Sequence, residues 1–287
     1  MRWKNGLSHC RVYNVANFTK FLIMSGRFAL SLLLLAACSV SAHAACLPIQ
    51  IAYLDQDRPP YWLGRGTDVP EPPGAAAELV RRFAASAGCQ AVLKRMPVLR
   101  IRPALQAGEI DFAPMEASGD NLPGLVFPRD RANRLDVERA VTSQIVIFVR
   151  ASDNPPRELS PARYLQGKLV GVTLGSPYIP RLLQAGLTLD SGATDVARNL
   201  DKLRLHRIDA FAVSVVSAGD MDGYVADKYG SELVRLPQPL YSDHIWLAAS
   251  QSYYDAHRAQ VEAMWNWLGA SGRKEFSALL DKYTDRH

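Results

Sequence analysis

The stretch VTSQIVIFV, residues 141–149, decides the fold because it separates two similar halves of the chain. It is long, apolar and rich in β-branched residues, which predicts a buried strand. The residues before it alternate between apolar strands, expected at 47–54, 91–93 and 110–115, and amphipathic helices, expected at 76–87 and 98–107. Strands that alternate with helices over short links predict a parallel sheet covered by helices.

The same alternation restarts after a polar, proline-rich segment at 152–161. A strand that crosses back and two helices then follow, the first of these helices with Val261, Met264, Trp265 and Leu268 on one face. The elements expected here are strands at 169–172, 187–189, 208–213 and 245–249 and helices at 176–185 and 194–206.

We therefore predict an α/β fold of two lobes, 45–145 plus 246–287 and 146–245, joined by two crossing strands. Ligands of parallel sheets bind outside the carboxyl ends of the strands. In two such lobes these ends face each other, so we expect the binding site in the cleft between them.

The formal charge of +5 belongs to one end of the chain. Residues 1–44 contain five of the 33 basic residues and no acidic residue, so 28 basic and 28 acidic residues remain in 45–287. A remainder without net charge excludes a general basic surface for nucleic acid.

The basic end has the parts of a secretory signal peptide. Arg27 precedes an apolar run at 28–37, and small residues follow up to Ala44. Ten helical residues rise only about 15 Å, half of a bilayer core, so the run does not span a membrane. We predict a signal peptide at 1–44, with Met24 as an alternative start, and export to the periplasm.

Two cleavage points remain open for this signal peptide. Plain cleavage after Ala44 releases a soluble protein. Residues 35–38, Leu-Ala-Ala-Cys, also resemble a bacterial lipobox, in which case Cys38 carries a lipid that anchors the protein to a membrane.

Cys46 and Cys89 are the cysteines that remain after plain cleavage. An even pair in an oxidising compartment predicts a disulfide, with two buried thiols as the alternative. The pair has no CxxC spacing and no histidine partner, so we expect neither a metal site nor a redox site there.

Several short motifs follow one another along the chain: residues 59–61 (PPY), 74–79 (GAAAEL), 97–100 (PVLR), 108–111 (GEID), 170–172 (VGV), 175–178 (GSPY), 207–210 (RIDA) with Leu203, and 282–283 (KY). In this order they resemble the bacterial periplasmic solute-binding proteins of the polar-amino-acid type, extracellular solute-binding family 3 with the type II fold, over about residues 49–283. This resemblance implies a monomer without cofactor, whose cleft closes on a small-molecule solute for the inner-membrane permease of an ABC importer.

The resemblance implies ligand contacts in the first lobe. Tyr61 and Trp62 follow the first strand, where family members present an aromatic ring to the ligand. Arg100 has the spacing before Gly108 of a carboxylate-binding arginine, although Val98 stands where that subgroup has an aromatic residue. Glu116 and Ser118 come at the end of a strand, where a ligand could receive a salt bridge or a hydrogen bond.

Further contacts are expected in the second lobe. Gly175 and Ser176 lie between a strand and a helix, where backbone N–H groups favour an anion. Ser176 is equally suited to cap the helix, and Tyr178 follows closely. Ser214 stands where amino-acid binders of the family have the aspartate that holds the α-ammonium group.

The arginine with which such amino-acid binders hold the α-carboxylate group is also missing. Family members that bind amino acids carry Thr-Glu-Arg after the first-lobe Gly-x-x-Asp motif, whereas residues 119–124 read GDNLPG, with no arginine before Phe127. A buried amine or carboxylate without a partner is costly. We therefore expect a small polar or carboxylate-bearing solute that is not an ordinary α-amino acid.

Two other classes of function compete with transport. One is a binding or sensor module, or a lipoprotein adaptor, that works without a transporter. The other is a dehydratase-like enzyme, which needs an acid–base pair where only Glu116 is suitably placed. The histidines at 206, 244 and 257 lack metal-ligand spacing, and no nucleophile elbow occurs, so we predict no catalytic residue and no metal.

Overall fold

The computed structural model describes residues 46–117, 122–155 and 158–284. The predicted signal peptide with Met24 and Cys38, and the candidate Ser118, lie outside these residues. None of the helices within the described ranges has the length and apolar character needed to cross a membrane.

The first lobe contains a parallel sheet, as predicted. Its central strand β1 pairs in parallel with β2 on one side, with Ile49 opposite Ala91, and with β3 on the other, with Ile51 opposite Phe112. The elements are β1 (Ile49–Leu54), α1 (Ala75–Ala85), β2 (Ala91–Met96), α2 (Val98–Gln106), β3 (Phe112–Met115) and the short β4 (Leu125–Val126).

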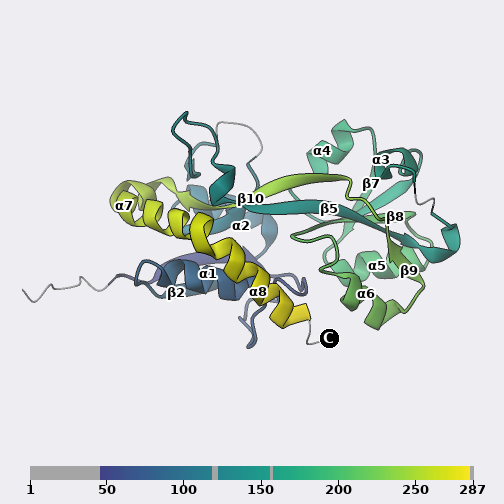
Figure 1. The fold of residues 1–287 in the computed structure, drawn as a ribbon, viewed down its shortest axis with the longest axis horizontal. Helices are drawn as coiled ribbons and strands as arrows, with labels where there is room; N and C mark the ends of the chain where they lie inside the picture. The colour runs from purple at the N-terminus through teal and green to yellow at the C-terminus, as the bar shows by residue number, and fades with distance from the viewer. Residues whose placement is uncertain (1–45, 118–121, 156–157, 285–287) are drawn as a thin grey trace, which may run out of the picture. The chain divides into compact units, whose positions relative to one another are not determined.

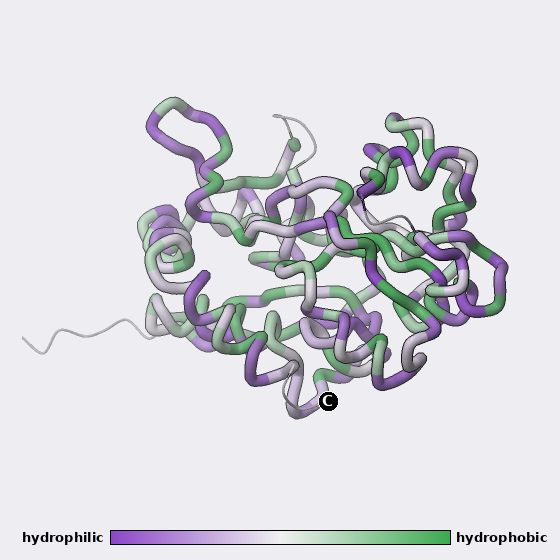
Figure 2. Tube along the Cα trace, turned by 45° about the vertical axis from the view of Figure 1, so that its right-hand side comes forward, coloured by the Kyte–Doolittle hydropathy of each residue, from purple (hydrophilic) through white to green (hydrophobic). Residues whose placement is uncertain are grey.

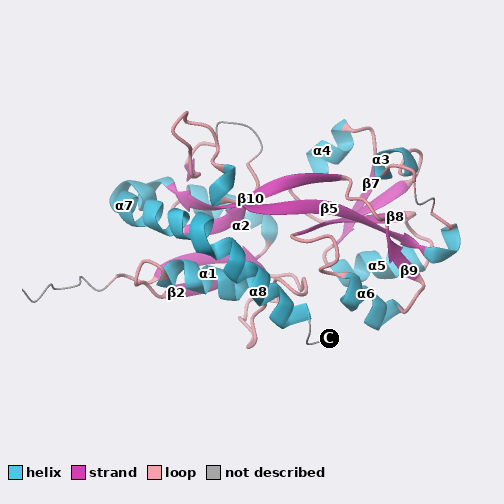
Figure 3. Cartoon of the chain, viewed as in Figure 1, coloured by secondary structure: helices cyan, strands magenta, loops and turns pink. Residues whose placement is uncertain are grey.

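The second lobe repeats this arrangement. Strand β6 pairs in parallel with β7 and with β8, while α3 to α6 lie around this sheet (Figures 1 and 3). The elements are α3 (Pro161–Tyr164), β6 (Leu169–Thr173), α4 (Ile179–Gln184), β7 (Thr188–Ala193), α5 (Val196–Arg204), β8 (Ala210–Val215), α6 (Asp222–Tyr229) and β9 (Leu233–Arg235).

Two long antiparallel strands join the lobes, β5 (Val141–Arg150) and β10 (Tyr241–Ser250), which run side by side in Figure 1. β10 pairs with β5 over Tyr241–Ile245 and with β3 over Trp246–Ala249. The strand order of the described chain is therefore β2-β1-β3-β10-β5-β8-β6-β7. The predicted two-lobed α/β fold with two crossing strands is confirmed. The predicted lobe limits stay a prediction, since residues 45–287 form one compact unit.

The C-terminal helices return to the first lobe. α7 (Gln251–Trp267) and α8 (Arg273–Thr284) are joined by a π-helical turn at Leu268–Gly272. α8 lies against α1, where Lys282 Nζ is 2.7 Å from a carboxylate oxygen of Glu78. Strands and helices both contribute hydrophobic residues to the core, whereas the outer loops are more hydrophilic (Figure 2).

Several element bounds differ from the sequence prediction. β8 begins two residues later than expected, and β10 begins at Tyr241, four residues earlier. The polar residues at 242–244 conceal this part of β10, because three consecutive polar residues break both an apolar run and the alternation typical of a strand. α3, α6, β4 and β9 were not expected, since each is too short for a clear periodic pattern.

The helix expected at 176–185 begins only at Ile179. Gly175 has a φ of +75°, and a turn follows it up to Tyr178. Positive φ is accessible to glycine at little cost, so this residue ends the strand in a turn and delays the helix.

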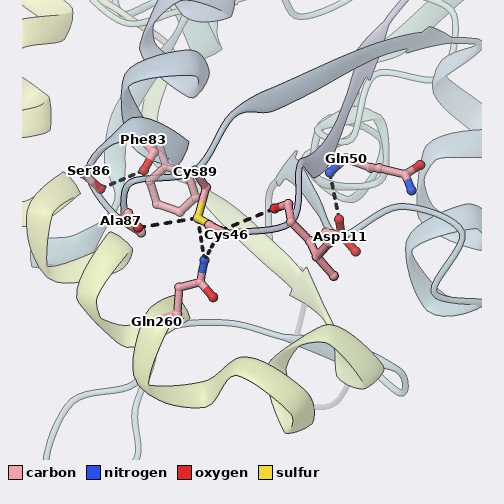
Figure 4. Close-up of a disulfide and its surroundings, with 9 residues drawn as sticks. Cys46, Gln50, Phe83, Ser86, Ala87, Cys89, Asp111 and Gln260 are labelled. Carbon is pink, nitrogen blue, oxygen red and sulfur yellow. Dashed lines mark hydrogen bonds between the residues drawn. A yellow bond between two sulfur atoms is a disulfide. The ribbon is translucent and has the colours of Figure 1, made fainter. Parts of the chain in front are cut away.

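The predicted disulfide between Cys46 and Cys89 is present, with the two Cα atoms 5.0 Å apart (Figure 4). It ties the residues before β1 to the turn between α1 and β2. The side chain of Gln260, from α7, lies over the bridge, with Nε2 2.9 Å from one sulfur and 2.7 Å from the other.

Reducing this disulfide should lower the free energy of unfolding. The bridge closes a loop of 43 residues, and the chain-entropy model gives such a loop about 4 kcal/mol. We expect urea unfolding of the oxidised protein to shift to lower urea when a thiol reductant is added. The Cys46→Ser, Cys89→Ser double variant should unfold at the lower urea concentration with and without reductant; equal stability of the oxidised wild type and this variant would contradict the prediction.

Candidate ligand cavity

A cavity of about 430 Å³ lies at the carboxyl ends of strands from both lobes. Leu54 ends β1, and Glu116 follows β3 directly. On the other side, Gly175 lies two residues after β6, and Val215 ends β8. The cavity thus lies where the parallel-sheet topology predicts a binding site, and its volume is within the range of small-molecule sites.

Most of the cavity wall is apolar, and its floor includes the crossing strand β10. Apolar side chains come from both lobes and from the C-terminal helices: Leu79, Val80, Val98, Ile101, Met115, Val141, Val215, Val216, Ile245, Trp246, Leu247, Leu268 and Phe276. Such a wall offers a hydrophobic surface to a solute, with orientation left to a few polar groups.

Arg58 is one of these polar groups, and the sequence analysis did not include it. It lies in the loop after β1 and donates a hydrogen bond from Nη2 to the backbone carbonyl of Ser214 in β8. Its Nε is buried and has no hydrogen-bond partner. No carboxylate of the described residues forms an ion pair with Arg58, so its charge is not neutralised by a direct partner within that part of the chain.

Glu116, a predicted contact, lines the cavity and is the acidic group there. Burial, with the negative charge of nearby Asp243, raises the pKa of Glu116 to about 7, although the positive charges of Arg58 and Arg181 act in the opposite direction. At neutral pH its carboxyl group is therefore present in both the protonated and the ionised form.

Tyr61 and Trp62 line the cavity as expected, but much of each side chain is engaged within the protein. Tyr61 is 5% exposed; its hydroxyl donates to Asp220 Oδ2 and accepts from the N–H of Val216 at 2.8 Å. Burial, together with the charge of Asp220, raises its pKa well above the usual value. The Trp62 ring stacks on Tyr53, 4.5 Å between centroids.

Contacts of this kind hold the two lobes together around the cavity. Tyr61 and Arg58 come from the first lobe, and their partners Asp220 and Ser214 come from the second. Gly175 approaches α2 so closely that an added Cβ would lie 2.5 Å from a methyl carbon of Val98. The described chain is therefore in a closed arrangement.

The other second-lobe candidates have different surroundings. Tyr178 is 3% exposed, lines the cavity and donates from its hydroxyl to the carbonyl of Ala212 at 3.2 Å. Ser176 does not line the cavity. The expectation that Ser176 caps a helix is wrong, because α4 has only six residues and begins after Tyr178, which makes no side-chain capping bond.

Arg100 is exposed and does not line the cavity, whereas Arg102 does. Residues four apart lie on one face of a helix, and Arg102 is four residues after Val98, which also lines the cavity. Within the described ranges, Arg102 has no ion-pair partner. The four-residue spacing from Val98 would have identified Arg102 as a residue of the same helix face. Arg58, like Glu116, follows the carboxyl end of a strand, where ligands of parallel sheets bind.

Ser214 lies in the cavity wall as expected and is 4% exposed. Its carbonyl already accepts from Arg58. All the predicted solute contacts stay predictions: those of Tyr61, Trp62, Arg100, Glu116, Ser118, Gly175, Ser176, Tyr178 and Ser214. Among the described residues, no cluster of three His, Cys, Asp or Glu side chains could hold a metal ion.

Replacing Tyr61 by Phe should weaken the closed arrangement. The substitution removes the partner of the Val216 N–H and one donor to Asp220, so we expect a loss of about 1–3 kcal/mol in unfolding free energy. It should also increase the radius of gyration of the ligand-free protein in solution scattering. Tyr254→Phe is the matched control, because its hydroxyl bonds to Glu262 inside the C-terminal helical region; an unchanged radius for Tyr61→Phe would speak against the closing role.

The pKa of Glu116 predicts a pH-dependent stability. The folded protein holds this proton more tightly than the unfolded chain, so stability should fall as pH rises from about 4.5 to about 7 and then level off. A shift of this size corresponds to roughly 3 kcal/mol. We expect Glu116→Gln to lack this decline and to be more stable than the wild type at pH 8; parallel pH profiles in urea unfolding would refute the shift.

Comparison with known proteins gave matches in structure only. No protein-family model matches the chain, and no curated protein sequence does. The GluR0 ligand-binding core of Nostoc punctiforme, in complex with L-glutamate, superposes with a TM-score of 0.60 at 17% identity, over 82% of this chain and 99% of that one.

Two further solved structures agree with this match. The periplasmic VFT2 domain of Bordetella pertussis BvgS has a TM-score of 0.58 at 17% identity, over 83% of this chain and 93% of that one. The amino-acid ABC transporter substrate-binding protein AbpA of Streptococcus pneumoniae, bound to L-arginine, has a TM-score of 0.58 at 18% identity, over 83% and 94%. At these identities the likeness concerns the fold, and this chain has the two-lobed type II periplasmic-binding fold.

Proposed function

We propose that the chain is a periplasmic solute-binding protein that captures a small organic solute for an ABC importer. The observation that carries this proposal is the cavity of about 430 Å³, whose wall comes from both lobes and contains Arg58, a guanidinium group without an ion-pair partner among the described residues. A solute that contacts both lobes stabilises the closed arrangement more than an open one, which couples binding to closure.

Binding of a solute is consistent with the neighbours in fold. Among them, one binding core is in complex with L-glutamate and one transporter-associated protein is bound to L-arginine. Those ligands belong to those proteins, and the solute of this chain has to be deduced from its own cavity.

The solute is not an ordinary α-amino acid. Ser214 brings no charge to the wall, and its carbonyl is already engaged by Arg58. The only acidic residue among those that line the cavity in the described chain is Glu116, whose pKa is about 7. An α-ammonium group would thus lack a permanently ionised partner there.

A thermal-shift screen tests this function. The protein is exported with its own leader, purified from the periplasm and heated with millimolar amino acids, opines, polyamines and small organic acids. A solute with a micromolar dissociation constant should add about 4 kcal/mol of stability at millimolar concentration. If no solute of a broad panel raises the melting temperature, transport is refuted and an adaptor or sensor role without a small solute is favoured.

A further inference from the structure

We infer that the solute is a carboxylic acid with an apolar body and no ammonium group, and that Arg58 holds its carboxylate. This inference rests on the proposed function, because it specifies the solute of the same cavity.

The charges of the cavity wall favour an anion. The charged residues that line it in the described chain are Arg58, Arg102 and Glu116. Neither arginine has an ion-pair partner among the described residues, and Glu116 contributes at most one negative charge. The wall is therefore positive in both protonation states of Glu116, and an anionic solute would be attracted to it.

Arg58 has the geometry of an anchor for a carboxylate. Its bond to the carbonyl of Ser214 uses Nη2 and holds the guanidinium group between the lobes. Its Nε–H is buried without an acceptor. A carboxylate that enters the cavity would neutralise the charge of this guanidinium group, and guanidinium groups bind carboxylates through two parallel hydrogen bonds. Arg58 is thus a binding residue that also contacts both lobes.

The apolar residues of the cavity wall determine which chemical groups the rest of the solute can have. Leu79, Met115, Val215, Trp246, Leu247 and Phe276 are among the apolar residues that line the cavity. Apolar groups gain free energy on transfer to such surroundings. A second polar group on the body would lose its hydration without finding a partner among these side chains.

An ammonium group would be unfavourable beside the same anchor. The Ser214 carbonyl already accepts a hydrogen bond from Arg58, and the guanidinium charge beside it would repel an ammonium group. Glu116 is the remaining candidate partner. It lies in the field of Arg58, and its burial favours the neutral form that cannot pair with a cation.

Matched solutes separate these possibilities by isothermal titration calorimetry at pH 7. 3-Phenylpropionate, L-phenylalanine and 2-phenylethylamine share one apolar body and carry a carboxylate, both groups, or an ammonium group. 4-Methylpentanoate, L-leucine and isopentylamine form the aliphatic series. We expect the carboxylate of at least one series to bind at least tenfold more tightly than its amino acid, and the amines not to bind.

The other outcomes overturn the inference in distinguishable ways. Equal or tighter binding of an amino acid or an amine refutes the solute class while the proposed function stands. So does failure of both series when the panel solute that binds carries an ammonium group or lacks a carboxylate. Failure of every solute in the panel refutes the proposed function itself.

Substitutions test the anchor. We expect Arg58→Gln to weaken binding of the preferred carboxylate at least thirtyfold and Arg58→Lys to weaken it less. Arg163→Gln is the matched control, because this arginine is exposed on α3 outside the cavity, and should leave the affinity unchanged. Urea unfolding of each variant verifies the fold, and Arg58→Lys keeps the test valid if Arg58→Gln is unstable.

Wild-type affinity in a folded Arg58 variant would refute the anchor. Glu116→Gln gives an independent readout. We expect it to keep or strengthen carboxylate binding, since it removes a negative charge from the wall. A tenfold weaker affinity would show that the solute uses an ionised Glu116 and would overturn the absence of an ammonium group.

Discussion

The change of pairing partner along β10 is the constraint on which the rest of the structure depends. Over five residues this strand pairs with β5, and over the next four it pairs with β3. Because one continuous strand belongs to both halves of the sheet, the carboxyl ends of β1 and β3 lie opposite those of β6 and β8. Ile245, Trp246 and Leu247, at the change of partner, form part of the cavity wall. The strand that joins the lobes therefore also contributes to the site.

Closure around this cavity uses contacts of the protein itself. The Tyr61 hydroxyl and the Arg58 guanidinium form hydrogen bonds to groups of the second lobe. These contacts leave the Arg58 Nε–H and the charge of Arg102 without a partner in the described chain, while Glu116 is pushed towards its neutral form by burial. Buried donors and charges without a partner are unfavourable. The closed protein thus retains positively charged groups for which an anionic solute can supply a partner.

The candidate site was predictable where it depends on strand ends, and less so where it depends on loops and helix faces. Glu116 and Ser214 line the cavity because each lies at the carboxyl end of a strand. Arg100 was chosen for its spacing from Gly108, yet the turn of α2 places Arg102 at the cavity instead. Ser176 lost its expected place because Gly175 adopts a positive φ and the helix begins later. Arg58 was missed because nothing in its neighbouring residues indicates that its partner lies 156 residues away.

By itself, the sequence determined the order of the longer strands and helices, the parallel pairing within each lobe, the two crossings and the disulfide between Cys46 and Cys89. These features follow from periodicity, from the short links and from an even number of cysteines, which are all local or compositional properties. Only the tertiary structure decided which charged groups share the cavity and which of them have partners. Such pairings join residues of different lobes, so they depend on how the crossing strands bring the two sheets together and not on spacing along the chain.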